Sequence, residues 1–470
     1  MRLKKMAAIG LAVVMTAGMT AGCGGSDDGA AAGGKAESQT ATVNEDGKTV
    51  ITIWSKDRHD AKYVQDKVDA FNQNNQDNIE VNYQLYTDNF KQAVDLAVQS
   101  GELPDILNLQ DQVYNQYVNQ GQWADLYQFM DEDMKNYFSG QIYEGINEVD
   151  GKLYYIPTCG TTGRLIYNKE IFEKAGIDAP PASLEEMVED ARTITSKLSG
   201  EGIYGFAQNM KSASSSLERS LDMGMERESG IKKGFDFAKG EYDFTGYAAA
   251  LDCWKQLLSE DCAFPGCESL DIDPLRTQFA NGKIGMYISW THAEPGVYKD
   301  QFPMDSASWD AAPIPTVGGK ESGKQNITFT SAYLLNADSP NVEKAFQVYK
   351  EIFANEAFLT GYYEGGYGIS IIPAVVENAK LDAEYESKKW LQMSDLDGVL
   401  PLNPQEKNAQ AVIVEGEDYY KTFESIYYGG ADPVPTLQDL TERYNKAYQQ
   451  GISDGQGTEI KIENYDPMNP

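Results

Sequence analysis

The sequence predicts an α/β protein with a parallel sheet, because short strands and amphipathic helices alternate after about residue 45. Three runs have the composition or the alternation of buried strands, at residues 50–54 (VITIW), 79–83 and 106–109. Between them, apolar residues recur at helical spacing, first Val64, Val68 and Phe71, and then Phe90, Ala93, Val94, Ala97 and Val98. Strands that alternate with helices in this order are expected to run parallel and to be joined by right-handed crossovers.

This order also predicts where a ligand would bind. In open parallel sheets, ligands bind beyond the carboxyl ends of the strands. The segments that follow the first and third predicted strands are residues 54–57 and 110–112. We therefore expect the side chains of these two segments to face a common site.

The rest of the chain continues the alternation. Ser183 and Glu186 form a capping box that opens a helix after Pro180 and Pro181. Residues 284–288 (IGMYI) are a further strand, a helix is expected to start at Pro340, and Thr436 is expected to cap the last amphipathic helix.

Residues 1–22 have the composition of a signal peptide. A basic start precedes an apolar run over residues 6–19, and small residues lead to Cys23. The segment resembles a bacterial lipoprotein signal, whose cysteine is lipidated, although Thr20 stands where an aliphatic residue is usual. Residues 24–35 (GGSDDGAAAGGK) are rich in Gly, Ala and Ser, and residues 23–47 are expected to form a flexible stalk. The alternative is an ordinary signal peptide cleaved nearby.

Length and charge narrow the class of protein. The 470 residues are enough for two or three domains with a large core. The formal net charge is −33, so phosphate-rich partners such as nucleic acid and anionic lipid are disfavoured. We read the charge as solubility at a cell surface.

The cysteines leave two alternatives open. One disulfide among Cys253, Cys262 and Cys267 is compatible with an exported chain, and reduced buried thiols are an equally good reading. Cysteine spacings that fit no C-x₂-C pair and only two histidines disfavour a zinc site. No metal and no cofactor is expected.

Several segments together resemble the family 1 extracellular solute-binding proteins, which include maltodextrin-binding protein. They are residues 101–105 (GELPD), 151–157 (GKLYYIP), 165–176 (LIYNKEIFEKAG), the capping box after Pro180-Pro181, and residues 279–290 (FANGKIGMYISW). Each motif is weak alone, but their joint order is specific. The resemblance covers nearly all of residues 50–450.

This resemblance implies a two-lobed periplasmic-binding-protein-like fold (type II), with hinge crossings and a ligand cleft between the lobes. It implies an N-terminal lobe of residues 48–157 and 313–368 and a C-terminal lobe of residues 158–312 and 369–470. The crossings would lie just after Pro157, near residues 313–315 and around residues 365–373, where Pro and Gly cluster.

The resemblance also places ligand contacts on a few loops, and those loops hold side chains that suit a sugar. Aromatic faces pack on sugar rings, while polar side chains exchange hydrogen bonds with hydroxyls. The candidate residues are Trp54, Lys56, Asp111, Gln112, Thr158, Thr161, Trp290, Tyr363, Glu364 and Tyr420. Each has a structural alternative as an ordinary core or surface residue.

The implied function is capture of a carbohydrate, expected to be an oligosaccharide, as the substrate-binding subunit of an ABC importer. The expected partners are the carbohydrate, the permease subunits and a lipid anchor at Cys23, on a monomer outside the cytoplasm and without nucleic acid. No catalytic constellation is apparent in the sequence, so the protein is not expected to be an enzyme. The alternatives are a secreted carbohydrate-active enzyme and a binder of a peptide, a polyamine or a metal chelate.

Overall fold

The structure is a computed structural model that describes residues 42–86 and 89–470. The predicted signal peptide, Cys23 and most of the predicted stalk lie outside the described residues. The described end of that stalk, residues 42–47, turns back so that Val43 bridges Thr49. Within the described part of the chain, none of the helices combines the length and the apolar composition that crossing a membrane requires.

The first sheet has the strand order β15-β3-β1-β2. Its strands are β1 (Thr49–Ser55), β2 (Ile79–Leu85), β3 (Ile106–Asn108) and β15 (Tyr333–Leu335). β1 pairs in parallel with both β2 and β3, and β15 is antiparallel to β3. The predicted parallel unit of three strands is therefore confirmed.

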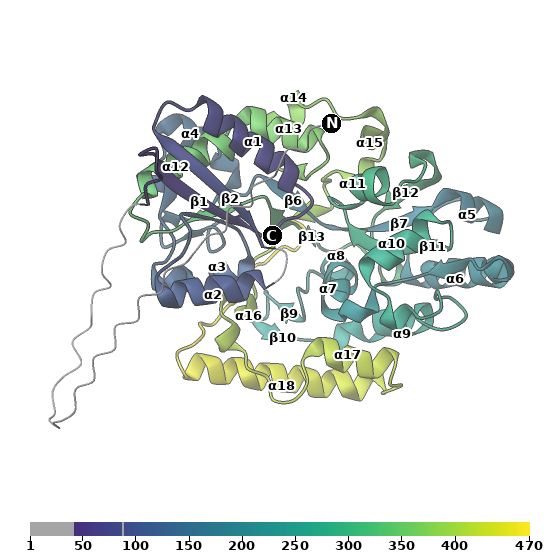
Figure 1. Ribbon diagram of the computed structural model, residues 1–470. Helices are drawn as coiled ribbons and strands as arrows, with labels where there is room; N and C mark the ends of the chain where they lie inside the picture. The colour runs from purple at the N-terminus through teal and green to yellow at the C-terminus, as the bar shows by residue number, and fades with distance from the viewer. Residues whose placement is uncertain (1–41, 87–88) are drawn as a thin grey trace, which may run out of the picture. The chain divides into compact units, whose positions relative to one another are not determined.

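Helices cover both faces of this sheet (Figure 1). They are α1 (Ala61–Asn74), α2 (Phe90–Ser100), α3 (Asp111–Tyr117), α4 (Glu132–Tyr137), α12 (Val342–Ile352), α13 (Glu356–Glu364) and α14 (Pro373–Asn378). The buried face of α1 consists of the predicted Val64, Val68 and Phe71, which pack with Ile51 and Ile53 of β1. On the opposite face, α2 buries Phe90, Val94 and Ala97 against Leu107 of β3.

The second sheet has the order β12-β7-β11-β8 and mixes parallel and antiparallel pairs. Its strands are β7 (Gly163–Asn168), β8 (Tyr204–Phe206), β11 (Ile284–Trp290) and β12 (Trp309–Ala312). The associated helices are α5 (Lys169–Ala175), α6 (Leu184–Leu198), α7 (Ala213–Leu217), α8 (Met223–Ser229), α9 (Ala248–Leu257), α10 (Ile272–Ala280), α17 (Tyr419–Tyr427) and α18 (Pro433–Ser453). The predicted capping box of Ser183 and Glu186 opens α6.

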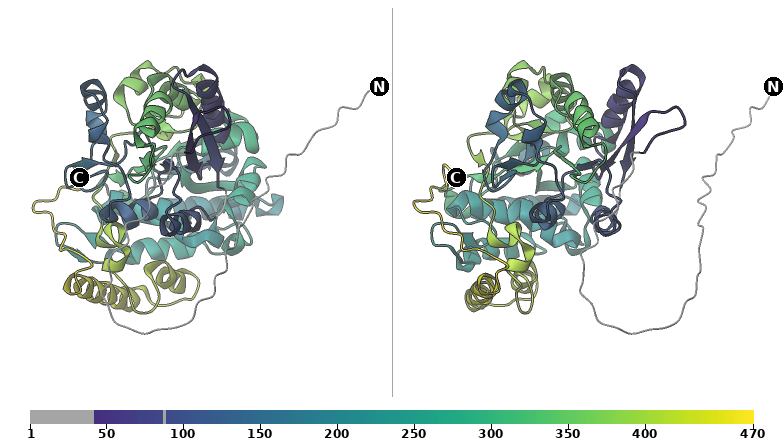
Figure 2. Two further views of the ribbon diagram at one scale, coloured as in Figure 1. Left: turned by 60° about the vertical axis from the view of Figure 1, so that its left-hand side comes forward. Right: turned by 90° about the vertical axis from the view of Figure 1, so that its left-hand side faces the viewer.

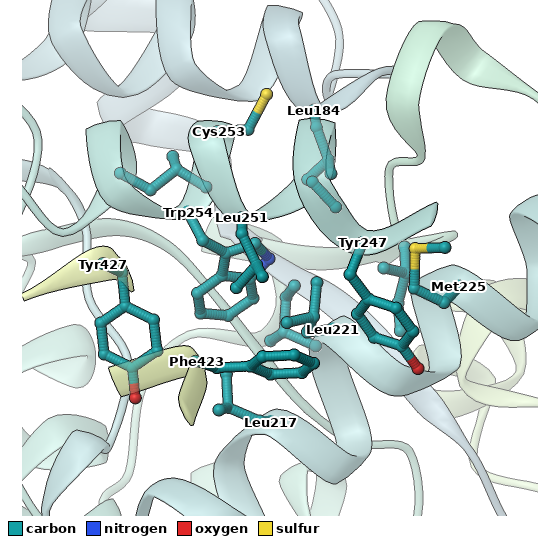
Figure 3. Close-up of a cluster of buried hydrophobic side chains, with 14 of the residues drawn as sticks. Leu184, Leu217, Leu221, Met225, Tyr247, Leu251, Cys253, Trp254, Phe423 and Tyr427 are labelled. Carbon is teal, nitrogen blue, oxygen red and sulfur yellow. The ribbon is translucent and has the colours of Figure 1, made fainter. Parts of the chain in front are cut away.

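The core beside this sheet joins segments that are distant in sequence. Trp254 of α9 lies among Leu217, Leu221 and Phe423, and Figure 3 shows these side chains pointing into one cluster. α17 supplies Phe423, and it lies beside α18 in every view (Figures 1 and 2). Burial of these large side chains therefore attaches the end of the chain to the second sheet.

A third, three-stranded sheet consists of β6 (Cys159–Thr161), β14 (Thr328–Thr330) and β16 (Ile369–Ser370), with β6 in the middle. β6 leads from the core of the first sheet into β7, and β14 leads back to β15. β6 and β16 lie in segments expected to contain crossings. The return strand β14 lies later than the expected residues 313–315, because Ile314 is still buried in the core of the second sheet. Ile369, Ile372 and Val375 are buried in the core of the first sheet.

Short strand pairs and helices complete the fold. The pairs are β4 (Glu148–Val149) with β5 (Lys152–Leu153), β9 (Phe235–Asp236) with β10 (Glu241–Tyr242), and β13 (Gln325–Asn326) with β17 (Asp397–Gly398). The short helices are α11 (Glu294–Gly296), α15 (Ala383–Ser387) and α16 (Pro404–Lys407).

Two predicted helix starts are wrong. α18 begins at Pro433 rather than after Thr436, because the side chain of Asp432 accepts from the backbone N–H of Val434 and Pro433 occupies the first turn. α12 begins at Val342 rather than at Pro340. The predicted buried stripe of Leu437, Leu440, Tyr444 and Tyr448 on α18 is confirmed.

A buried ion pair fixes β17 to the second sheet. Arg164 of β7 donates from Nη2 to Oδ2 of Asp397 at 2.5 Å, and both side chains are almost completely buried. Arg164 also donates from Nε to the carbonyl oxygen of Trp390 at 2.9 Å. Because neither charge has access to water, each depends on the other.

We expect Arg164→Met to lower the free energy of unfolding by about 3–5 kcal/mol, because the carboxylate of Asp397 would remain buried without its cation. Urea unfolding at pH 7 measures this. The double variant R164M/D397L should be more stable than R164M, since it removes the unpaired charge. If the double variant is the less stable of the two, the buried pair is not the cause.

Candidate functional site

A cavity of about 80 Å³ lies between elements of the two large sheets. One wall is α3, which follows β3. The opposite wall is the segment from Glu218 to Lys233, and residues 326–329 and 399–406 complete the lining. The charged lining residues are Asp111, Glu218, Glu226, Glu406, Lys232 and Lys233, and the aromatic ones are Tyr114, Tyr155 and Phe329.

The strand order explains why the α3 wall is open to a ligand. β2 and β3 lie on opposite sides of β1, so the chain leaves β1 and β3 in different directions. A crevice forms at such a point, at the carboxyl ends of the strands. Asp111 is the first residue of α3, directly after β3, and it is exposed to solvent although protein surrounds it on the cavity walls.

The opposite wall begins with a π-helical turn, Glu218–Asp222, which continues into α8. This turn approaches β7 so closely that a Cβ at Gly163 would lie 2.0 Å from the carbonyl oxygen of Arg219. Only glycine fits there. π-Turns are frequent at functional sites, and this one directs Glu218 into the cavity while Asp222 is buried.

Lys232 and Lys233 reach the cavity from a tight hairpin turn. The backbone N–H and C=O groups of Lys232 and Phe235 pair with each other, so Lys233 and Gly234 form the two central residues of a hairpin turn. Both have positive φ, +49° at Lys233 and +81° at Gly234. This is the pattern of a type I′ turn, in which Asn-Gly is the usual pair.

The two lysines and two of the carboxylates form one ion network. Lys233 Nζ lies 2.8 Å from Glu218 Oε1 and 3.2 Å from Glu406 Oε1, and Lys232 Nζ lies 3.1 Å from Glu406 Oε2. Burial alone would raise the pKa of Glu406, but the two lysines outweigh it and lower the pKa to about 2. Glu406 is therefore ionised throughout the neutral range.

The pKa values of two further carboxyl groups, Glu226 and Asp222, are raised instead of lowered. Burial raises the pKa of Glu226 to about 8, although Lys232 opposes the shift. Burial raises the pKa of Asp222 to about 7. Asp222 accepts hydrogen bonds from three phenols, at 3.2 Å from Tyr247 and 3.1 Å from both Tyr419 and Tyr420. The surrounding protein and Glu406 also raise the pKa of Asp111.

Of the residues predicted from the sequence, Asp111 lines this cavity. Tyr420 lies beneath it, bonded to Asp222. Lys56 forms an ion pair with Asp57 at 2.8 Å, and its charge acts on Asp111. Trp290, at the end of β11, is half-buried and packs against the core of the second sheet.

The other predicted residues are placed outside the cavity lining. Thr158 is buried and donates to the carbonyl oxygen of Ser331, and buried Thr161 contacts Thr291 at 3.2 Å. Tyr363 is buried and donates to Gln392 Oε1 at 2.5 Å. The remaining three are Trp54, half-buried with its ring 4.5 Å from Tyr86, exposed Gln112, and exposed Glu364, which accepts from the backbone N–H of Lys380.

Sequence reasoning missed Glu218, Glu226, Lys232, Lys233 and Glu406. Their segments come together only through tertiary contacts, so neither periodicity nor a short motif marks them. The one local signal is the glycine that follows the two lysines, because glycine readily takes the positive φ of a tight turn.

The four cysteines of the described residues, Cys159, Cys253, Cys262 and Cys267, are free and buried. This favours the reduced alternative for the last three. Burial raises the pKa of the Cys159 thiol to about 12, so a nucleophilic thiolate at this position is disfavoured.

Residues 55–357 match the family model of the bacterial extracellular solute-binding proteins, which is more than half of the chain. The chain belongs to this family. Membership places the solute-binding chain outside the cytoplasm.

Relatives and solved structures agree with this assignment. A Brucella abortus protein named as a binding protein is 26% identical over 331 residues, covering 70% of this chain and 75% of that protein. The diacetylchitobiose binding protein DasA of Streptomyces coelicolor is 25% identical over 475 residues, covering 96% of this chain and 100% of DasA. The GacH receptor of Streptomyces glaucescens, solved unliganded and with acarbose, has a TM-score of 0.65 at 16% identity, covering 85% of this chain and 98% of GacH. The expected two-lobed α/β fold of a solute-binding protein is confirmed.

We expect Glu406→Gln to lower the stability of this solute-binding protein at pH 7 by on the order of 3 kcal/mol, since two lysines lose their shared anion. Because the folded pKa of Glu406 is depressed, its contribution is complete above its unfolded pKa near 4.5 and is lost as the pH falls towards 2. The deficit of the variant should therefore shrink between pH 7 and pH 3, as measured by urea unfolding. The exposed Glu268→Gln is the control, and a deficit that does not depend on pH would contradict the ion-pair explanation.

Proposed function

We propose that the chain is the substrate-binding subunit of an ABC importer, which captures a carbohydrate between its two lobes and delivers it unchanged to a membrane permease. The observation that carries the proposal is the family match over residues 55–357. The names of DasA and of the GacH complex mention a diacetylated disaccharide and acarbose, which supports an oligosaccharide as the cargo.

The chemistry of the cavity suits a hydroxyl-rich ring. Ionised Glu406 accepts hydrogen bonds, as do the side-chain oxygens of Glu218. Lys232 and Lys233 donate them, and the carboxyl group of Glu226 can do either near neutral pH. Phe329 and Tyr155, whose rings lie 6.4 Å apart, provide apolar faces for C–H groups. A neutral sugar presents both kinds of surface.

The size of the cavity implies movement. Ligand pockets commonly enclose about 300–1,000 Å³, whereas this cavity encloses about 80 Å³. A solute larger than a few water molecules therefore requires the walls to separate. We propose that the lobes rotate about the strands β6 and β14, through which the chain passes between the two large sheets.

A screen of mono- and oligosaccharides by thermal shift tests the proposal. A ligand at one hundred times its dissociation constant adds about 2.7 kcal/mol to the native state, which is easily seen as a higher melting temperature. Chromatography should then recover the ligand unchanged. Product that accumulates in proportion to the protein would instead indicate a carbohydrate-active enzyme, and a shift only with peptides, polyamines or metal chelates would indicate another cargo.

We expect Asp111→Asn to fold with a stability within about 0.5 kcal/mol of the parent, because Asp111 is exposed. Its affinity for the sugar found in the screen should fall roughly tenfold, since one carboxyl oxygen on the cavity wall is replaced by an amide nitrogen that cannot accept a hydrogen bond. Isothermal titration calorimetry measures the affinity, and the exposed Asp178→Asn is the matched control. Equal affinities in both variants and the parent would place the sugar elsewhere.

We also propose that the chain is anchored through a lipid on Cys23. The support is the small-residue run before this cysteine and the Gly-rich segment after it. Cys23→Ala should move the protein from the membrane fraction to the soluble fraction, as followed by fractionation and immunoblot. Finding the parent chain free in the medium would refute the anchor.

A further inference from the structure

The only two histidines of the chain contact each other. His59 lies in the loop that follows β1, and His292 lies in the loop that follows β11. Their ring centroids are 5.6 Å apart, with the ring planes at 59°. β1 belongs to the first large sheet and β11 to the second. The contact therefore joins the two halves of the molecule.

Each ring is also held beside a strand of the small three-stranded sheet. His59 Nε2 lies 2.9 Å from the carbonyl oxygen of Tyr367, two residues before β16. His292 Nδ1 lies 2.8 Å from Oγ1 of Thr161, the last residue of β6. Rotation of the lobes about the connecting strand β6 would therefore change the contact between the two rings.

The charges around the pair come from several elements. On the His59 side, Asp57 and Asp60 belong to the same loop, and the hydroxyl of Tyr362 from α13 lies 3.3 Å from His59 Nε2 and donates to Asp60 at 2.8 Å. Tyr362 is therefore a neutral neighbour.

On the His292 side, two cations face the ring. Arg276 of α10 pairs with buried Glu294 at 2.8 Å, and Lys56 pairs with Asp57 at 2.8 Å. Asp57 is the one carboxylate that favours a protonated His292, while Arg276, Lys56 and His59 oppose it. The local balance disfavours a second positive charge.

We propose that His59 and His292 form a pH-sensitive contact between the lobes, which holds while His292 is neutral and opens in acid. The contact would regulate the capture cavity and to that extent rests on the proposed function. Acidification outside the cell would weaken capture, and a return to neutral pH would restore it.

The direction of the effect follows from proton linkage. Burial, reinforced by His59, lowers the pKa of His292 to about 3 in the contact, compared with about 6.5 for a solvated histidine. Above pH 6.5 His292 is neutral in both arrangements, so the contact is at full strength. As the pH falls below 6.5, the separated form takes up a proton that the contact resists, and separation becomes favoured.

Proton linkage sets an upper limit on how far a fall in pH can shift the balance between contact and separation. At pH 5 a solvated imidazole of pKa 6.5 is about thirtyfold more often protonated than neutral, which is the upper limit for one linked proton. Because His292 remains partly exposed, we expect a change of roughly three- to thirtyfold in the balance between contact and separation.

The first test needs no ligand. With two histidines in the chain, histidine-selective ¹³C labelling gives two imidazole signals, and His59→Gln leaves the signal of His292 alone for assignment. We expect His292 in the parent to titrate well below pH 6.5 and to shift towards 6.5 in H59Q. Small-angle scattering should show a larger radius of gyration at pH 5.0 than at pH 7.5 in the parent, and a smaller difference in H292N.

The second test uses the oligosaccharide with the largest thermal shift in the screen. Its dissociation constant in the parent should rise roughly three- to thirtyfold from pH 7.5 to pH 5.0. Asp222 and Glu226 titrate in the same range, so the comparison is between parent and variants at each pH. His292→Asn keeps a polar atom near Nδ1, and His59→Gln keeps one near Nε2. Both should show a smaller rise than the parent.

Two results would overturn the inference. One is a parent in which both imidazoles titrate independently near pH 6.5 with an unchanged radius of gyration. The other is an equal rise in dissociation constant in parent, H59Q and H292N, which would assign the pH dependence to the carboxyl groups. If H292N does not fold, H59Q decides the question. A screen without any sugar ligand would leave the labelling and scattering results standing on their own.

Discussion

The carboxylate of Glu406 is where three distant segments of the chain meet. Lys232 and Lys233 reach it from a hairpin turn, and Glu218 shares Lys233 with it from the π-helical turn. Burial of Lys232 and partial burial of Glu406 and Lys233 are tolerable because each of these charges faces one of opposite sign. The backbone carbonyl of Glu406 also accepts from the side chain of Asn115 on α3, at 2.7 Å. The hydrogen bond from Asn115 and the ion network thus hold α3 against the opposite wall of the cavity.

The pKa values of neighbouring carboxyl groups shift in opposite directions. The direction depends on how closely cations approach each group. Glu406 has two lysines at hydrogen-bonding distance and stays ionised, whereas buried Glu226 holds its proton near neutral pH. Asp222 is intermediate, because burial raises its pKa while Lys233 and the phenols of Tyr419 and Tyr420 favour its charged form. The cavity therefore presents ionised acceptors and a protonated carboxyl donor side by side, which is a suitable combination for hydroxyl groups that both donate and accept.

The sequence predicted those parts of the structure that local patterns determine. The strands β1, β2 and β3 and the buried faces of α1 and α2 follow from spacing alone, and Asp111 follows because it comes directly after β3. The return strand β14 and most of the cavity wall could not be found in this way. Packing brings Glu218, Lys233 and Glu406 together from segments up to 188 residues apart. The spacing of apolar residues along the chain does not predict such distant contacts. Tyr363 looked equally suitable as a sugar contact, but its neighbours bury it in a core.

Lys233 shows what this arrangement demands of the chain. A side-chain-bearing residue with φ of +49° stores about 1 kcal/mol or more of backbone strain, which an asparagine or glycine in this turn would reduce. The chain nevertheless has a lysine at this strained position, and its side chain forms two ion pairs there. The turn is thus a local compromise between foldability and the placement of one positive charge, and an asparagine at this position would relieve the backbone strain only by giving up both ion pairs.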